Sequence, residues 1–128
     1  MTRYEGVKSH KDLDVWKKSV ALSVSIYEVT RLFPREELYA MSNQMRRAAV
    51  SIASNIAEGA ARRTDKDFIH FLHIALGSAS ELDTQVEIAH KVGFINKEKS
   101  DGLGNIIGEV SRMLYGLIRS VERRTHDH

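Results

Sequence analysis

The segment Gln44–Gln85 carries apolar residues at three- and four-residue spacing on both sides of a short basic stretch. This spacing is typical of one face of an α-helix, so the segment predicts two long helices joined by a turn. In its first half, Gln44–Gly59, a wide apolar arc runs beside a continuous polar stripe. The pattern constrains architecture and assembly, and it contains no catalytic motif.

The chain before and into this segment predicts two helices. A helix over 13–33 is stopped by Pro34, whose ring removes a backbone N–H and disfavours helical geometry in the residue before it. The second helix is expected over 37–58, with Gly59 as its C-terminal cap. Its predicted core face consists of Leu38, Met41, Met45, Ala49, Ile52 and Ile56.

The remaining chain predicts two more helices with recognisable ends. Thr64 is expected to cap a third helix that opens at Asp65, and Gly93 is expected to close it. Asn96 then caps a fourth helix over 97–123, which its interior glycines weaken. Four amphipathic helices joined by short turns pack most economically as an antiparallel up-down-up-down four-helix bundle, and no segment has strand-like alternation. The predicted fold class is therefore all-α.

The first predicted helix carries two apolar stripes. So broad an arc exceeds what the surface helix of a lone bundle needs. Helices one and two then carry more apolar surface than four helices can bury among themselves. We therefore expect identical copies of the chain to cover this surface. The positions that test the expectation are Val15, Leu22, Ile26 and Val50. One stripe is Leu13, Trp16, Val20, Val24 and Tyr27; the other is Val15, Leu22, Ile26, Val29 and Phe33.

Composition sets the broad class of the protein. The 128 residues suffice for one domain with a single core, and 42% hydrophobic and 28% charged residues are ordinary for a globular chain. We expect a partly ordered arm over 1–12, the bundle over 13–123 and a disordered tail over 124–128. Cysteine is absent, and neither a signal peptide nor an apolar run of membrane-spanning length is present, so a cytoplasmic location without membrane contact is expected.

Four stretches of the sequence carry a family resemblance. They are LDVWKKS (13–19), QMRRAAVSIASNIAEG (44–59), RRTDKDFIHFL (62–72) and GSASELDTQ (77–85). In this order they resemble the four-helix-bundle family known for proteins encoded in intervening sequences of bacterial 23S ribosomal RNA genes. The glycine-rich start of the fourth helix departs from the more charged pattern of that family.

The resemblance implies an assembly and a set of partners. Family members of known structure form ring-shaped homo-oligomers, notably pentamers, so the resemblance favours a pentamer of this chain. A related bundle, the accessory protein of diversity-generating retroelements, works with a reverse transcriptase and binds nucleic acid. The resemblance therefore makes the protein itself, RNA or DNA, and an enzyme partner the candidate partners.

A polar stripe on the second helix faces two polar residues of the third. Long polar and charged side chains beside apolar arcs usually form paired networks at an interface, because a desolvated charge needs a partner. The alternative is a contact surface for a ligand or nucleic acid. The predicted interface network comprises Gln44, Arg47, Ser51, Asn55 and Glu58 on the second helix, with Glu81 and Gln85 on the third.

Basic residues gather in the same part of the chain. Five cations and two carboxylates leave a local excess of three positive charges, although the formal charge of the whole chain is only +2. One explanation is a solvated helix end whose cations form salt bridges. The alternative is that the positive excess repeats around a ring of identical copies and forms a continuous band that binds nucleic-acid phosphates. The hypothetical nucleic-acid-binding residues are Arg46, Arg47, Arg62, Arg63 and Lys66.

The sequence contains no set of residues that indicates enzymatic chemistry. His70 and His73 lie at a spacing that could present two metal ligands, but no third ligand completes the set, so no metal and no cofactor are predicted. We therefore expect a non-enzymatic scaffold or adaptor, with RNA or DNA as a candidate ligand. The alternative is a protein-interaction module that docks an enzyme, such as a reverse transcriptase or an RNA-processing factor, without touching nucleic acid.

Overall fold

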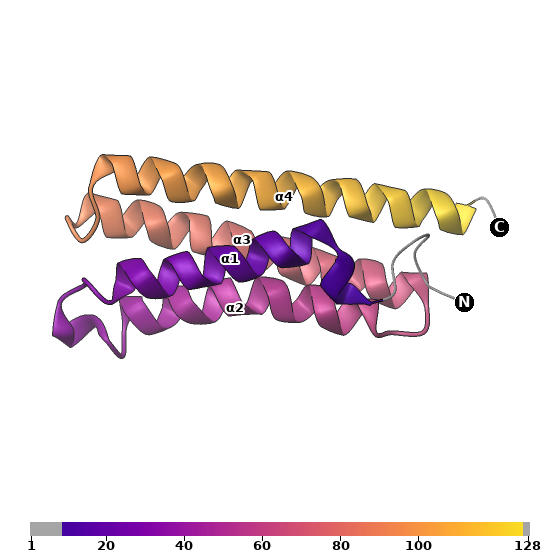
Figure 1. Cartoon of the computed structure of the whole chain (residues 1–128), viewed down its shortest axis with the longest axis horizontal. Helices are drawn as coiled ribbons and strands as arrows, with labels where there is room; N and C mark the ends of the chain where they lie inside the picture. Colours follow the sequence, from indigo (N-terminus) through magenta and orange to yellow (C-terminus); the bar gives the residue numbers. More distant parts are fainter. Residues whose placement is uncertain (1–8, 127–128) are drawn as a thin grey trace.

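The computed structural model describes residues 9–126, and within that range every regular element is a helix. Four long helices account for most of the chain, as the sequence predicts, and two short 3-10 turns precede α1 and α2 (Figure 1). The elements are η1 (His10–Asp12), α1 (Asp14–Thr30), η2 (Arg35–Glu37), α2 (Met41–Ala60), α3 (Asp65–Lys91) and α4 (Lys97–His126).

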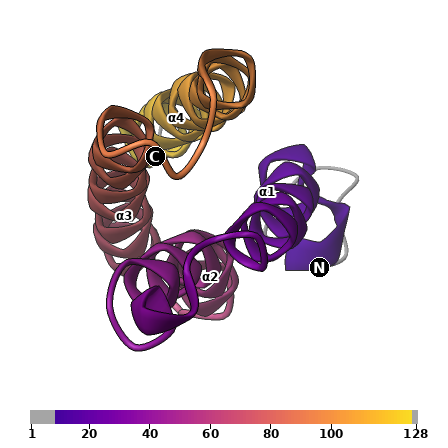
Figure 2. The ribbon, with the colours of Figure 1, turned by 90° about the vertical axis from the view of Figure 1, so that its left-hand side faces the viewer.

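The helices follow one another around the bundle in chain order. Each short connection reverses the direction of the chain, so neighbouring helices run antiparallel (Figure 1). Seen from the end, α2 packs closely on α3, whereas α1 and α4 approach each other less closely (Figure 2). An ion pair of 2.7 Å between Lys18 Nζ and Glu109 Oε1 bridges that looser seam. The molecule is thus an up-down-up-down bundle with one less tightly packed side.

Three helix ends lie where the sequence places them. Thr64 Oγ1 accepts a hydrogen bond of 3.1 Å from the Asp67 N–H, and α3 begins at the next residue. Gly93 has φ +90°, and Phe94 N–H bonds to the Ala89 carbonyl at 2.8 Å, which makes a Schellman end for α3. Asn96 Oδ1 accepts from the Lys99 N–H at 2.8 Å and caps α4. Local capping chemistry alone therefore set these ends.

The start of α2 differs from the prediction. The chain forms the short turn η2 after Pro34 and becomes α-helical only at Met41, rather than at residue 37. Leu38 therefore lies in the connection and is largely exposed, so its assignment to the core face was wrong. The break lies at Ala40, whose φ of −124° and ψ of −107° are not helical, so the turn that follows Pro34 does not continue into α2.

Gly59 is not the cap of α2. It lies inside the helix, one residue before its last, and keeps a helical backbone. A Cβ atom at this position would come within 2.8 Å of Phe71 Cβ and 3.0 Å of Phe68 Cδ1. The glycine is there because α3 approaches α2 closely, and a side chain would separate the two helices.

The C-terminal end of the bundle continues further than expected. The helix α4 includes residues 124–126, which the sequence interpretation assigned to a disordered tail. Arg124 Nη2 pairs with Asp65 Oδ1 at 2.8 Å, and Thr125 Oγ1 bonds to Asp65 Oδ2 at 3.1 Å. These contacts hold the last turn of α4 on the first turn of α3. Of the arm expected over 1–12, residues 1–8 lie outside the described residues. Its last three residues form η1.

Candidate functional site

Only one of the two apolar stripes of the first helix lies wholly in the core. Val15, Leu22 and Ile26 are buried inside the same chain, with Ile26 at 0% exposure. The expectation that a neighbouring copy covers these three was therefore wrong. In the other stripe, Leu13 and Trp16 are partly buried against the core, whereas Val20, Val24 and Tyr27 face outward, with Val24 52% exposed. The excess apolar surface exists, but on the opposite stripe of α1 from the one named.

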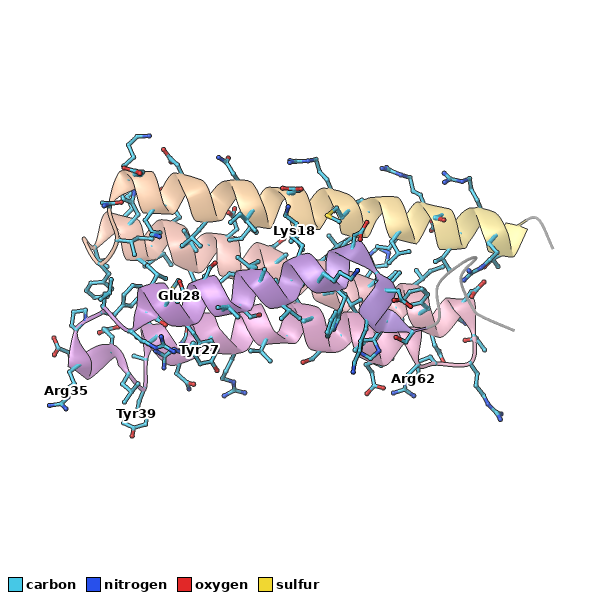
Figure 3. The ribbon with its side chains drawn as sticks, in the orientation of Figure 1. Lys18, Tyr27, Glu28, Arg35, Tyr39 and Arg62 are labelled. Atoms are coloured by element: carbon cyan, nitrogen blue, oxygen red, sulfur yellow. The ribbon has the colours of Figure 1, made fainter. Side chains whose placement is uncertain are left out.

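This outward stripe forms one wall of a groove between α1 and α2. Val50, the fourth position named for contact between copies, is exposed in the single chain and forms part of the other wall. The groove has a volume of about 420 Å³, and Tyr27 and Glu28 mark its α1 side (Figure 3). An apolar surface rimmed by polar residues is typical of an interaction site. The groove is lined by Val20, Ser23, Val24, Tyr27, Glu28, Arg31, Val50, Ala53 and Ser54.

Part of the predicted polar network joins α2 to α3 within the chain. The hydroxyl groups of Ser51 and Ser78 lie 2.8 Å apart, so one donates to the other. Asn55 Nδ2 donates to the Ser51 carbonyl at 2.8 Å and to Ser51 Oγ at 3.0 Å. Ser78, which the predicted network omitted, supplies the link to α3. Ser51 and Asn55, two of the five stripe residues on α2, therefore belong to the internal structure of the chain.

The other members of the stripe are arranged differently. Gln44, Arg47 and Glu81 are exposed, and Glu58 forms a surface ion pair of 3.7 Å with Arg62. Gln85 is buried, and its Oε1 atom has no hydrogen-bond partner among residues 9–126. The structure therefore does not bring all seven predicted residues into one network.

The predicted basic residues separate into two groups. Arg46 lies near the start of α2 and Arg62 just after its end, so most of the length of this helix, at about 1.5 Å per residue, separates them. Arg47 accompanies Arg46 near the start of α2, whereas Arg63 and Lys66 are exposed around the α2–α3 turn with Arg62. Figure 3 shows Arg62 at the opposite end of the bundle from Arg35. The two groups belong to different surfaces.

Each group contains one arginine held against an aromatic ring. The Arg46 guanidinium lies 4.9 Å from the centre of the Tyr27 ring, and its Nε donates to Thr30 Oγ1 at 2.9 Å. The Arg62 guanidinium lies 4.8 Å from the centre of the Phe71 ring. Cation–π contacts of this kind orient a guanidinium while its outer nitrogens stay accessible.

A second cavity, beside Arg46, was not found from the sequence. Its volume is about 410 Å³, and it lies where η2 joins the start of α2. Its cations come from three different elements, so their proximity depends on the path of the chain after Pro34 and has no sequence signal. The cavity is lined by Thr30, Arg31, Phe33, Pro34, Arg35, Leu38, Ser42 and Arg46.

In the described part of the chain, no three His, Cys, Asp or Glu side chains gather closely enough to hold a metal ion, and His70 instead contacts the ring of Phe71. None of the helices within residues 9–126 combines the length and apolar character needed to cross a bilayer.

Comparison with known proteins identifies the family. The 23S rRNA-intervening sequence protein family matches residues 11–116, a range that includes α1, α2, α3 and most of α4. The chain belongs to this family. The resemblance drawn from the four sequence stretches is thereby confirmed.

A solved structure agrees with this assignment. The chain is similar to a protein with unknown function from the S23 ribosomal protein family of Bacteroides thetaiotaomicron, whose crystal structure was determined at 1.70 Å. The two share 29% sequence identity with a TM-score of 0.77, over 82% of this chain and 95% of the other. No curated protein sequence matches the chain.

Proposed function

We propose that this member of the family is a non-enzymatic scaffold whose identical copies associate through the α1–α2 groove. The observation that supports this is the exposed stripe of Val20, Val24 and Tyr27 facing Val50 across the groove. Half-exposed apolar side chains gain free energy when a partner removes them from water, at roughly 25 cal/mol per Å². A closed ring is the proposed form of the assembly, and the family resemblance favours five copies.

The groove is the proposed centre of a larger contact. A stable interface buries about 800 Å² per partner, which the groove alone does not supply. The neighbouring α1 and α2 surface must therefore take part, including the charged rim residues Glu28 and Arg31. Opposite charges on one rim allow the same surface to pair with its counterpart on another copy.

Substitution in the groove tests the assembly. Val24→Arg introduces a charge at the centre of the proposed contact, so we expect it to convert the oligomer to monomers. Ile88→Arg is the matched control, because Ile88 is 43% exposed on α3 and lies outside the groove. Sedimentation velocity at micromolar concentration measures the outcome. A monomeric unmodified protein, or equal dissociation of both variants, would contradict the proposal.

Nucleic acid is the proposed ligand of the assembled scaffold. Arg62, Arg63 and Lys66 are exposed at one end of the bundle, and a ring would repeat them around its rim. Contacts of Arg and Lys with phosphates are tolerant of sequence and weaken with salt, because binding releases counterions. Repetition across copies raises the overall affinity without new contacts in each copy.

The salt dependence of binding tests this second part. The double variant Arg62→Ala/Arg63→Ala should weaken binding of single-stranded RNA and reduce the slope of log K against log salt by about 1.4, at about 0.7 for each phosphate contact. Fluorescence anisotropy across a salt series measures both quantities. Lys91→Ala/Lys99→Ala removes the same charge near the α3–α4 connection and should have little effect. RNA binding that changes neither with salt concentration nor on substitution of the two arginines would exclude nucleic-acid binding through these residues.

One observation favours a protein partner as the alternative. Leu32 and Tyr39, in the connection between α1 and α2, are 83% and 90% exposed. Large apolar side chains this exposed are typical of protein contact sites. Under this alternative the protein docks an enzyme, and the complex survives nuclease treatment during co-purification. Loss of the complex in Leu32→Ser/Tyr39→Ser would assign the contact to this connection.

A further inference from the structure

The first turn of α2 has more hydrogen-bond donors than acceptors. Its N-cap residue, Ala40, has no side chain that could accept a bond from the helix. Met41 N–H reaches Glu37 Oε1 only at 3.4 Å, and within residues 9–126 no backbone acceptor outside the helix serves the N–H groups of Ser42 and Asn43. Unpaired N–H groups at a helix start attract anions, because the helix dipole adds partial positive charge there.

Ser42 connects this helix start to the second cavity. The residue lines the cavity of about 410 Å³ and is only 2% exposed. Its hydroxyl makes no hydrogen bond with another described residue, yet it is not one of the fully buried polar atoms without a partner, so it keeps access to solvent at the cavity wall. The hydroxyl is therefore available to donate to a ligand in the cavity.

Two arginines bring positive charge to the same cavity. Arg46 uses its Nε for Thr30 Oγ1 and is held by the Tyr27 ring, which leaves its two terminal nitrogens for a ligand. Arg31 enters from the C-terminal end of α1. Within residues 9–126 no carboxylate forms an ion pair with Arg31 or Arg46. Arg35 also borders the cavity, but its side chain points away from the bundle (Figure 3).

We infer that this cavity binds a phosphate group, either free or within a nucleic-acid strand. Arg31, Arg46 and Ser42 all line the cavity and supply hydrogen-bond donors, and a guanidinium fork matches two phosphate oxygens. The volume leaves room for a sugar or base attached to the phosphate. The inference deepens the nucleic-acid part of the proposed function, and the cavity adjoins the α1–α2 groove because Arg31 lines both.

Glu37 is the one carboxylate that competes for this position. It weakly occupies the Met41 N–H, and its charge opposes a second anion at the same helix start. Glu37→Gln removes that charge and keeps an oxygen acceptor. Phosphate affinity should therefore rise several-fold in this variant, whereas a purely structural cavity would show no change.

Calorimetric titration of the full-length protein with inorganic phosphate, at constant ionic strength, tests the inference. We expect saturable binding, a loss of about tenfold or more in Arg46→Ala and a smaller loss in Ser42→Ala, because charge-assisted hydrogen bonds are the strongest contacts. Arg47→Ala, at the next position of the same helix, removes the same charge outside the cavity and should change the affinity by less than about twofold. Absence of saturable binding, or equal losses in Arg46→Ala and Arg47→Ala, would overturn the inference.

Two further variants test the inference if Arg46→Ala does not fold. Arg46→Lys keeps the charge but loses the planar fork, and Arg31→Ala removes the other cation without disturbing the Tyr27 contact. Circular dichroism establishes that each variant is folded. Both should weaken phosphate binding, and full affinity in both folded variants would overturn the inference.

Titration with a short single-stranded RNA distinguishes the two sources of phosphate. If Arg46→Ala weakens the binding of both inorganic phosphate and RNA, the cavity binds a phosphate of the RNA strand. If Arg46→Ala weakens the binding of inorganic phosphate alone, the ligand is a small phosphate compound. Either result supports the inference that the cavity binds a phosphate group. Failure of the proposed function is separable: if Arg62→Ala/Arg63→Ala leaves RNA binding unchanged, the proposed function fails, while saturable binding of inorganic phosphate that depends on Arg46 still supports the cavity.

Discussion

At the scale of single residues, the closest contact between helices depends on a hydrogen atom in place of a side chain. Gly59 lies where α2 approaches Phe68 and Phe71 of α3, and α2 and α3 form the most extensive helix pair of the bundle. The glycines of α4 have no such neighbour: an added Cβ at Gly102, Gly104 or Gly116 would meet no atom within 4 Å beyond its chain neighbours and the adjoining backbone of its own helix, and at Gly108 it would meet the flexible Arg112 side chain at 3.4 Å. Close helix packing therefore explains Gly59 but not the glycines of α4.

Gly59→Ala should lower the stability of the protein by about 1–3 kcal/mol, because overpacking against Phe71 outweighs the better helix propensity of alanine. The relevant contact is the 2.8 Å approach to Phe71 Cβ, an atom fixed close to the α3 backbone. Urea denaturation followed by circular dichroism measures the free energy of unfolding.

The matched control for this substitution is Gly116→Ala. Its Cβ projects into open space inside a helix, so stability should rise by about 0.5–1 kcal/mol. If both variants shift the stability in the same direction, the close approach of α2 and α3 does not explain Gly59.

At the scale of elements, the last turn of α4 is held by the first turn of α3. Asp65 accepts from Arg124 Nε at 3.2 Å and Nη2 at 2.8 Å, and it also accepts from Thr125. A bidentate pair of this kind is stronger than a single surface contact. Because the pair joins residues 59 positions apart, capping rules could not indicate it.

Asp65→Ala should destabilise the protein by about 1 kcal/mol and release the end of α4, since it removes the acceptor of both Arg124 and Thr125. Hydrogen exchange of the backbone amides in residues 119–125 measures that release.

Asp67→Ala is the control, because Asp67 lies in the same first turn and its side chain is exposed. Both substitutions lose the favourable charge at the start of α3. Only Asp65→Ala should accelerate exchange in α4, and equal acceleration would mean that the helix dipole, rather than the ion pair, explains the effect.

At the scale of the whole molecule, the bundle has an apolar groove on the side formed by α1 and α2. Four large apolar side chains at this groove, Val20, Val24, Tyr27 and Val50, are exposed in the single chain. If copies associate there, folding and assembly are thermodynamically linked, and the apparent stability depends on protein concentration.

The melting temperature of the unmodified protein should therefore rise as its concentration increases from low to high micromolar values, because mass action favours the assembled folded state. Differential scanning calorimetry over a concentration series measures this shift. Val24→Arg should melt at the same temperature throughout the series. A concentration-independent melting temperature in the unmodified protein would argue against assembly.

Features that depend on neighbours within a few residues were determined by the sequence alone. Thr64, Gly93 and Asn96 mark helix ends correctly, because a cap bonds only to the adjacent turn. The three- and four-residue spacing predicted four helices for the same reason. The family followed from four short stretches within 13–85, all of them inside the matched range.

Features that depend on how the helices rotate and approach one another were decided by the tertiary structure. Both stripes of α1 are apolar, and only packing against the other helices determined that Ile26 is buried while Val24 faces water. The same packing separated Arg46 from Arg62 and brought Arg46 beside Arg31 and Ser42. A periodic pattern defines the faces of a helix, but which face is buried depends on all four helices together, because the core must be filled without gaps.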